Sequence, residues 1–150
     1  MRIIELADHP GFIETIVDWN LKQWPKPERS REDVKARVFG KGIDDKLPRT
    51  LVLEEGNLPI GYSTMVLYEK GRAAARLPWI DAVYVTPESR KNGLGSMLIR
   101  ATEKTASRLG ISELFALTDI PELYLKLGWT VVEVQDGHPF GVVLSKRLEK

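Results

Sequence analysis

The chain has 150 residues, of which 43% are hydrophobic and 29% charged, with a formal net charge of +1. This length suits one domain, residues 1–150, with a sizeable core, and the small net charge gives no support for binding nucleic acid or a membrane surface. The sequence has no cysteine, which excludes disulfides, thiolate metal sites and an acyl-cysteine intermediate. An early acid argues against a signal peptide, and no apolar run spans a membrane, so we expect a cytoplasmic protein.

The first third of the chain predicts a strand followed by two helices. Residues 2–7 predict a short strand, and Asp8 is a candidate N-cap for the helix that follows. An apolar stripe predicts that helix over residues 12–23, and Pro25 and Pro27 end it.

A second helix and a hairpin come next. Ser30 and Asp33 have the spacing of a capping box, which predicts the start of the second helix. Residues 50–54 and 60–68 predict two strands, joined by E-G-N-L, a hairpin signal. Gly61 indicates a bulge or a close backbone approach within the second strand.

The central stretch combines a strand, a glycine-containing turn and a long helix. Residues 79–85 predict the strand, which Pro87 ends, and apolar residues at three- and four-residue steps predict a helix over residues 94–109. Between them lies R-K-N-G-L-G, residues 90–95. The first N–H groups of a helix lack intrahelical acceptors, and glycines let a phosphate approach them. The turn therefore favours binding of an anion. The alternative interpretation is that the glycines serve only the geometry of the turn.

The last third predicts a strand at residues 113–118, parallel to the central one because a helix intervenes. A short helix at residues 121–127 and a terminal hairpin of residues 129–134 and 140–145 complete the chain.

The central stretch resembles the signature of the GNAT superfamily of acetyl-CoA-dependent N-acetyltransferases. V-T-P at residues 85–87 and the residues from Arg90 to Gly95 fill that pattern, whereas Leu98 and Ser96 exclude the dinucleotide fingerprint and the P-loop. The resemblance implies that the pyrophosphate of acetyl-CoA lies on backbone N–H groups at the helix start, with its pantetheine arm along the strand edge. The implied cofactor-binding residues are Val83, Tyr84, Val85, Arg90, Lys91, Asn92, Gly93, Leu94, Gly95 and Ser96.

The order of predicted elements is similar to that of the GNAT fold over the whole chain. The resemblance implies a mixed α/β (α+β) fold: a mostly antiparallel sheet of about seven strands, helices on both faces and a splayed parallel pair at the centre. Y-L-K-L-G-W at residues 124–129 is similar to a second family segment, which implies that Tyr124 protonates the departing thiolate. The alternative for Tyr124 is a core aromatic residue.

Acetyl transfer should be direct, since the sequence has neither a cysteine nor an evident metal cluster. An alkyl amine of pKa about 10 must lose a proton before it attacks the thioester. Asp81 is the first candidate for the base, because strand alternation predicts it on the face of Val83 and Val85. Asp119 and His138 are the other candidates, and a structural role is the alternative for Asp81.

The acceptor amine is less well defined. The resemblance implies that the acceptor enters beside the first two helices, where Trp24 lies, and beside the central strand, where Trp79 lies. Trp24, Trp79 and Asp119 are therefore the candidate substrate-binding residues. W-N-L-K-Q-W-P-K-P-E-R-S-R, a Trp-Pro segment that includes Arg29, is somewhat similar to a segment of the actin N-terminal acetyltransferase and its bacterial relatives. Three functions remain open: acetylation of a small-molecule amine, acetylation of a protein N-terminus or lysine, and non-catalytic acyl-CoA binding. The family resemblance also allows a homodimer. The acids that could favour a cationic amine are Glu54, Glu55, Glu69, Asp81 and Asp119.

Overall fold

One mixed sheet organises the computed structural model, which describes all residues except 26, 40–46, 70–75, 135–140 and 150. Within the described chain the strands lie in the order β1-β2-β3-β4-β5-β7-β6. The strands are β1 (Arg2–Glu5), β2 (Arg49–Glu55), β3 (Leu58–Glu69), β4 (Arg76–Val85), β5 (Glu113–Thr118), β6 (Thr130–Val134) and β7 (Val142–Arg147). The α-helices are α1 (Ile13–Gln23), α2 (Arg31–Phe39), α3 (Leu94–Arg108) and α4 (Pro121–Leu125), and the 3₁₀ helices are η1 (Leu6–Asp8), η2 (Pro10–Phe12) and η3 (Pro87–Ser89).

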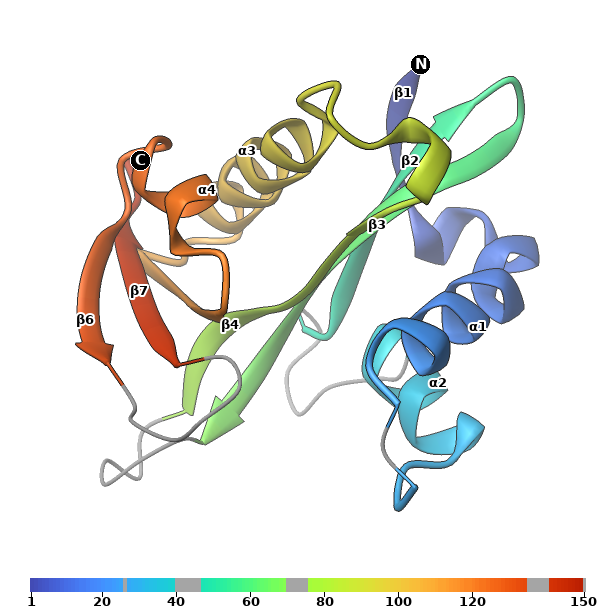
Figure 1. Ribbon diagram of the computed structural model, residues 1–150, viewed down its shortest axis with the longest axis horizontal. Helices are drawn as coiled ribbons and strands as arrows, with labels where there is room; N and C mark the ends of the chain where they lie inside the picture. The colour runs from blue at the N-terminus through green and yellow to red at the C-terminus, as the bar shows by residue number, and fades with distance from the viewer. Residues whose placement is uncertain (26, 40–46, 70–75, 135–140, 150) are drawn as a thin grey trace.

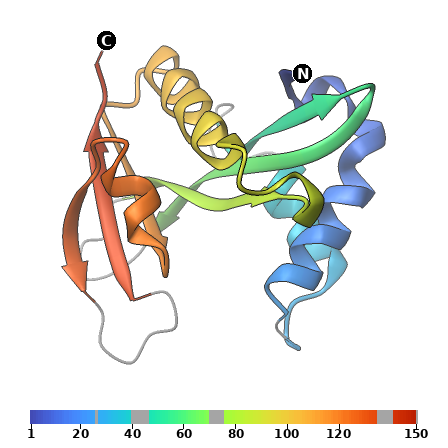
Figure 2. The same ribbon diagram turned by 45° about the horizontal axis from the view of Figure 1, so that its top comes forward.

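Helices cover both faces of this sheet. Figures 1 and 2 show α1 and α2 on one side and α3 and α4 on the other. Alternation along the strands explains the division, because Tyr62 packs in the cluster that includes α1 and α2 while its neighbour Ser63 is hydrogen-bonded to Thr102 of α3. The predicted mixed fold with helices on both faces is confirmed.

β4 and β5 form the parallel pair, and they separate after a short contact. The pairing consists of Trp79 with Phe115 and Ile80 with Ala116. β4 continues to Val85 and β5 to Thr118 without further pairing between them. The predicted splayed pair is therefore confirmed, and it leaves backbone groups of both strands beside an opening in the sheet.

A β-bulge changes the direction of one predicted site residue. On β3, Thr64 pairs with Ala82 and Met65 pairs with Ile80, so Asp81 is the extra residue on β4. The prediction that Asp81 shares a face with Val83 was wrong, because simple alternation fails across a bulge. Asp81 instead points to α2, while Val83 packs in the cluster that includes residues of α3.

The two helix starts differ in how well the sequence predicted them. Asp8 lies in η1, and α1 follows Phe12 with no side-chain cap, so the predicted N-cap was wrong. The η1 and η2 turns take up the residues between β1 and α1. The capping box is confirmed: Ser30 N–H donates to Asp33 Oδ2 (3.0 Å), and Asp33 N–H donates to Ser30 Oγ (3.1 Å).

Gly61 lies where two strands approach closely, as its sequence context predicted. A Cβ atom at this position would lie 2.7 Å from the carbonyl oxygen of Tyr84. Because backbone cannot move away easily, we expect Gly61→Ala to lower the free energy of unfolding by about 1–3 kcal/mol. Urea unfolding measures this, with Gly11→Ala as the control, since a Cβ at Gly11 meets nothing within 4 Å. Equal stability of the two variants would contradict the expectation.

Candidate active site

The opening between β4 and β5 forms a cleft of about 540 Å³. This volume lies in the range of small-molecule sites. Its walls come from α1, the chain between α1 and α2, α2, β4, β5 and α4, so it reaches from one helical layer to the other. The described lining residues are Asn20, Gln23, Trp24, Arg29, Arg37, Trp79, Ile80, Asp81, Ala82, Val83, Leu117, Thr118, Asp119, Ile120, Leu123 and Tyr124.

Residues predicted from three distant parts of the sequence meet at this cleft. Trp24 comes from the end of α1, Trp79 and Asp81 from β4, Asp119 from the turn after β5, and Tyr124 from α4. Only the tertiary structure could bring them together. The remaining base candidate, His138, lies outside the described residues.

The Tyr124 side chain is buried beside the cleft, with 5% of the residue exposed. Its ring packs edge-on against Trp129 at a centroid distance of 5.1 Å. Burial raises the pKa of the Tyr124 phenol above its ordinary value, so the phenol stays protonated at neutral pH. Burial is the sole cause of this shift, and none of the described residues forms a hydrogen bond with the hydroxyl. A protonated, unpaired phenol at a cleft wall can donate a proton to a bound group.

Asp81 is held by an ion pair that sequence reasoning did not predict. Both of its carboxylate oxygens accept hydrogen bonds from Arg37 of α2, at 2.8 and 2.7 Å. The Asp81 side chain remains 24% exposed. The pair fixes the orientation of the carboxylate at the cleft, and a carboxylate oxygen that accepts one hydrogen bond still has a second lone pair for a water molecule.

The start of α3 presents unpaired backbone donors, as predicted. The helical hydrogen bonds begin with Met97 N–H to the Gly93 carbonyl oxygen at 3.1 Å, so the preceding N–H groups have no helical acceptor. Gly93 has a φ of 75°, and Lys91, at 70°, is a non-glycine residue with positive φ. A Cβ at Gly93 would meet nothing within 4 Å, so space in front of these donors is open. Open space and unpaired N–H groups fit a phosphate.

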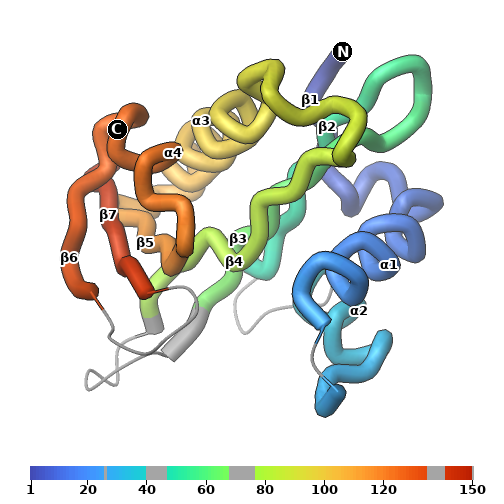
Figure 3. The backbone as a smooth tube through the Cα atoms, in the orientation of Figure 1, coloured from blue at the N-terminus to red at the C-terminus, as the bar shows by residue number. Residues whose placement is uncertain are grey.

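This helix start adjoins the cleft. A Cβ at Gly95 would lie 3.7 Å from the Leu123 side chain, and Leu123 lines the cleft. Figure 3 follows the backbone from β4 through η3 into α3. A phosphate-bearing cofactor bound at α3 could therefore extend its other end toward Tyr124.

Arg90 and Tyr84, both predicted to bind the cofactor, have structural contacts instead of facing the cleft. Arg90 Nε donates to the Val85 carbonyl oxygen at 2.8 Å, and its guanidinium lies 5.4 Å from the centre of the Tyr84 ring. The Tyr84 ring stacks on Trp19 of α1. These contacts attach the glycine-containing turn to β4, and the Tyr84 side chain packs between Arg90 and Trp19 outside the cleft lining.

Arg37, Arg29 and Asn20 are among the cleft residues that were absent from the predicted site. Arg37 is part of the charged surface of α2, where its sequence context gives no signal. Arg29 was noted only as part of the Trp-Pro segment. Asn20 is a buried polar residue at a core position of α1, between apolar residues of the same stripe, and that pattern could have identified it.

The acids considered for a cationic acceptor do not gather at the cleft. Among the described side chains only Asp81 and Asp119 line it. Glu54 is 5% exposed and accepts a hydrogen bond from Arg2 at 2.7 Å between β1 and β2. The hypothesis that these five acids together favour a cationic amine is therefore not supported for Glu54 and Glu55, which do not line the cleft.

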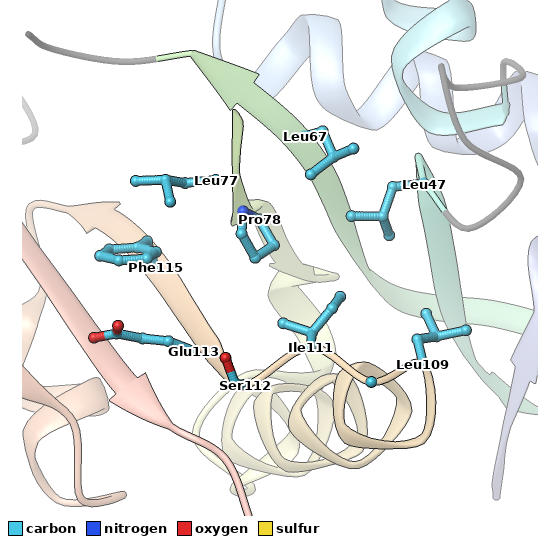
Figure 4. Close-up of a pocket in the computed structure, with 10 residues that line it drawn as sticks. Leu47, Leu67, Leu77, Pro78, Leu109, Ile111, Ser112, Glu113 and Phe115 are labelled. Atoms are coloured by element: carbon cyan, nitrogen blue, oxygen red, sulfur yellow. The ribbon is translucent and has the colours of Figure 1, made fainter. Parts of the chain in front are cut away.

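A second cavity, of about 360 Å³, lies at the other end of the β4–β5 contact. Figure 4 shows aliphatic side chains around it, including Leu47, Leu67 and Ile111. Its lining lacks the combination of acid, phenol and helix start found at the larger cleft. Glu113 is the one carboxylate among its described lining residues, and neither a phenol nor a helix start lies beside it there.

The described residues offer no further candidate for a metal site or a membrane span. They contain no cluster of three or more histidine, aspartate or glutamate residues able to hold a metal ion. None of the helices in the described part of the chain is long and apolar enough to cross a membrane.

The fold and this cleft agree with the acyltransferase class that the sequence predicted. The sequence matches the family model described as "Acetyltransferase (GNAT) family" over residues 13–129, and the protein belongs to that family. The co-substrate is accordingly acetyl-CoA. No curated protein sequence matches the chain.

Solved structures with the same fold share little sequence with this chain. The aminoglycoside 6'-N-acetyltransferase from Enterococcus faecium is 15% identical, with 100% of this chain and 98% of that chain covered and a TM-score of 0.74. YncA of Salmonella typhimurium, with its cofactor acetyl-CoA, is 21% identical, with coverages of 99% and 93% and a TM-score of 0.71. N-acetylglutamate synthase from Neisseria gonorrhoeae, complexed with coenzyme A and N-acetyl-glutamate, is 22% identical; 100% of this chain matches 36% of that chain, with a TM-score of 0.66.

Proposed function

We propose that this acetyltransferase transfers the acetyl group of acetyl-CoA directly to a primary amine of a small molecule. The observation that carries the proposal is the cleft between β4 and β5, which is lined by Tyr124 and Asp81 and meets the start of α3 where Leu123 lies beside Gly95. A volume of about 540 Å³ suits a small acceptor. Two of the structures with the same fold are named as acetyltransferases or synthases of small amines, which agrees with this assignment.

The backbone N–H groups at residues 91–96 would hold the pyrophosphate, and the β4 edge at Val83 would hold the arm that follows it. Acetyl-CoA, when bound, supplies an acetyl thioester whose carbonyl carbon the amine attacks. A new C–N bond forms and the C–S bond breaks. Asp81 receives the proton of the amine through a water molecule, and Tyr124 donates its phenolic proton to the departing sulfur.

Release of free thiol from acetyl-CoA tests this proposal. The purified protein is supplied with acetyl-CoA and, separately, with small primary amines and with peptides that carry a free N-terminus or a lysine. We expect amine-dependent thiol release with small amines and little with peptides. Faster release with peptides would favour acetylation of a protein N-terminus or lysine. Binding of acetyl-CoA without release by any acceptor would indicate a non-catalytic binding protein.

The role of Asp81 can be separated from its structural contact with Arg37. Asp81→Asn keeps the shape of the side chain but removes the base, so we expect kcat/KM at neutral pH to fall about a hundredfold, the lower end of general-base effects. Arg37→Gln breaks the same ion pair and leaves the carboxylate, so a smaller loss is expected. Steady-state kinetics on both variants decide the matter. If the two variants lose activity equally, Asp81 only positions α2.

A further inference from the structure

The cleft has one wall rich in polar groups, formed by α1, α2 and the chain between them. Arg29 donates a hydrogen bond from Nη2 to the Trp24 carbonyl oxygen, while its Nε is buried and has no partner among the described residues. Asn20, 4% exposed, donates from Nδ2 to the Tyr62 hydroxyl at 2.9 Å, and its Oδ1 also lacks a described partner. A buried donor and a buried acceptor without partners, both on residues that line a cleft, indicate a place where a ligand supplies them.

The charges around the cleft are of both signs and lie on different walls. The charged side chains among its described lining residues are those of Arg29, Arg37, Asp81 and Asp119. Arg37 and Asp81 neutralise one another through their two hydrogen bonds. Arg29 on the helical wall and Asp119 on the β5 side are then the two charges without an ion-pair partner among the described residues.

We infer that the acceptor is a zwitterion: a small molecule that carries both the reacting amine and an anionic group, either a carboxylate or a phosphate. Arg29 binds the anionic group, and the amine lies toward Asp119 and the Asp81 carboxylate. Guanidinium N–H groups bind planar carboxylates and phosphates well. The inference names the substrate class of the proposed acetyl transfer and rests on that function. Polyamines and other polycations would place a positive charge beside Arg29, so they are poor acceptors.

Matched pairs of acceptors test the charge requirement. Thiol release is measured with the protein α-amino acids other than cysteine and with their α-amides, and with O-phosphoethanolamine and ethanolamine. The members of each pair have the same amine but differ in the anionic group. We expect kcat/KM to be about tenfold or more higher for the anionic member of at least one pair, the value of one charge-assisted hydrogen bond. The preferred pair identifies carboxylate or phosphate. Equal or better activity with the neutral members, or with spermidine, would overturn the inference.

Arg29→Gln then assigns the preference to one side chain. We expect this variant to raise KM about tenfold for the anionic acceptor while KM for its neutral partner and the Kd for coenzyme A stay the same. Arg29→Lys should recover part of the preference, because it keeps the charge. Arg31→Gln is the matched control: Arg31 is on α2, pairs with Glu14 and Asp18 and does not line the cleft. A uniform loss with both acceptors in Arg29→Gln would show a structural role only.

Failure of the proposed function is distinguishable from failure of this inference. If no amine of either kind releases thiol, acetyl transfer to small amines is wrong. Calorimetric titration of the coenzyme A-loaded protein with the same paired probes then gives a second readout. Binding of an anionic probe that Arg29→Gln removes supports the assigned site, and binding that ignores Arg29, or no binding of any probe, overturns it.

Discussion

Gly95→Val is expected to weaken acetyl-CoA binding about a hundredfold while the protein stays folded. The isopropyl group would stand among the N–H groups at the start of α3, and loss of two charge-assisted hydrogen bonds to a phosphate corresponds to about that change in Kd. The fold should tolerate the change, because a Cβ at Gly95 meets only Leu123, at 3.7 Å. Isothermal titration with acetyl-CoA measures the effect.

Gly93→Val should have the same effect on binding, with an added cost in stability from its φ of 75°. Gly110→Val controls for that cost. Gly110 has a φ of 84°, follows the other end of α3, and has equally open space for a Cβ. We expect both variants to lose about 1–3 kcal/mol of unfolding free energy, but only Gly93→Val to lose coenzyme binding. If Gly93→Val and Gly95→Val both bind acetyl-CoA with an unaltered Kd, the pyrophosphate does not bind at the start of α3.

Tyr124→Phe is expected to lower kcat about a hundredfold, the lower range of general acid catalysis, without changing the Kd for acetyl-CoA. Phenylalanine keeps the edge-on contact with Trp129, so the fold should not change. Because burial raises the pKa of Tyr124, the wild-type rate should show no loss from its ionisation as pH rises to about 9. Pre-steady-state and steady-state thiol release measure the rate.

A matched variant separates chemistry from packing in this experiment. Phe115→Leu changes an aromatic residue of β5 that packs against Trp79 and does not line the cleft, so its effect should appear in stability and not in kcat. An unchanged kcat in Tyr124→Phe would assign the tyrosine to the core. A parallel loss of kcat in both variants would point to disturbed packing in place of proton transfer.

Local sequence patterns were enough to predict candidate segments for cofactor binding and for the reaction. The turn from Arg90 to Gly95 could be recognised because the needs of a phosphate, unpaired N–H groups and absent side chains, are met by consecutive residues. Tyr124 was identified by a short segment in the expected order. The capping box of Ser30 and Asp33 was predicted for the same reason, since its two hydrogen bonds join residues three apart.

Predictions failed where the deciding contact comes from a distant part of the chain. The direction of Asp81 depends on a bulge against β3 and on Arg37, which is 44 residues away in the sequence. Alternation along β4 alone could not indicate either. Asp8 was assigned as an N-cap from its residue type, but the path from β1 to α1 includes two 3₁₀ turns that place it elsewhere.

The amino-acid sequence by itself determined the family, the order of the elements and the glycine-containing start of α3, because each depends on neighbouring residues. The tertiary structure decided how far β4 and β5 separate, which way Asp81 points and which charged residues line the cleft. These features arise where residues far apart in the chain come together: Arg37 pairs with Asp81, and Arg29 and Asp119 line the same cleft. The charges that would select an acceptor are assembled only when the sheet and both helical layers have formed.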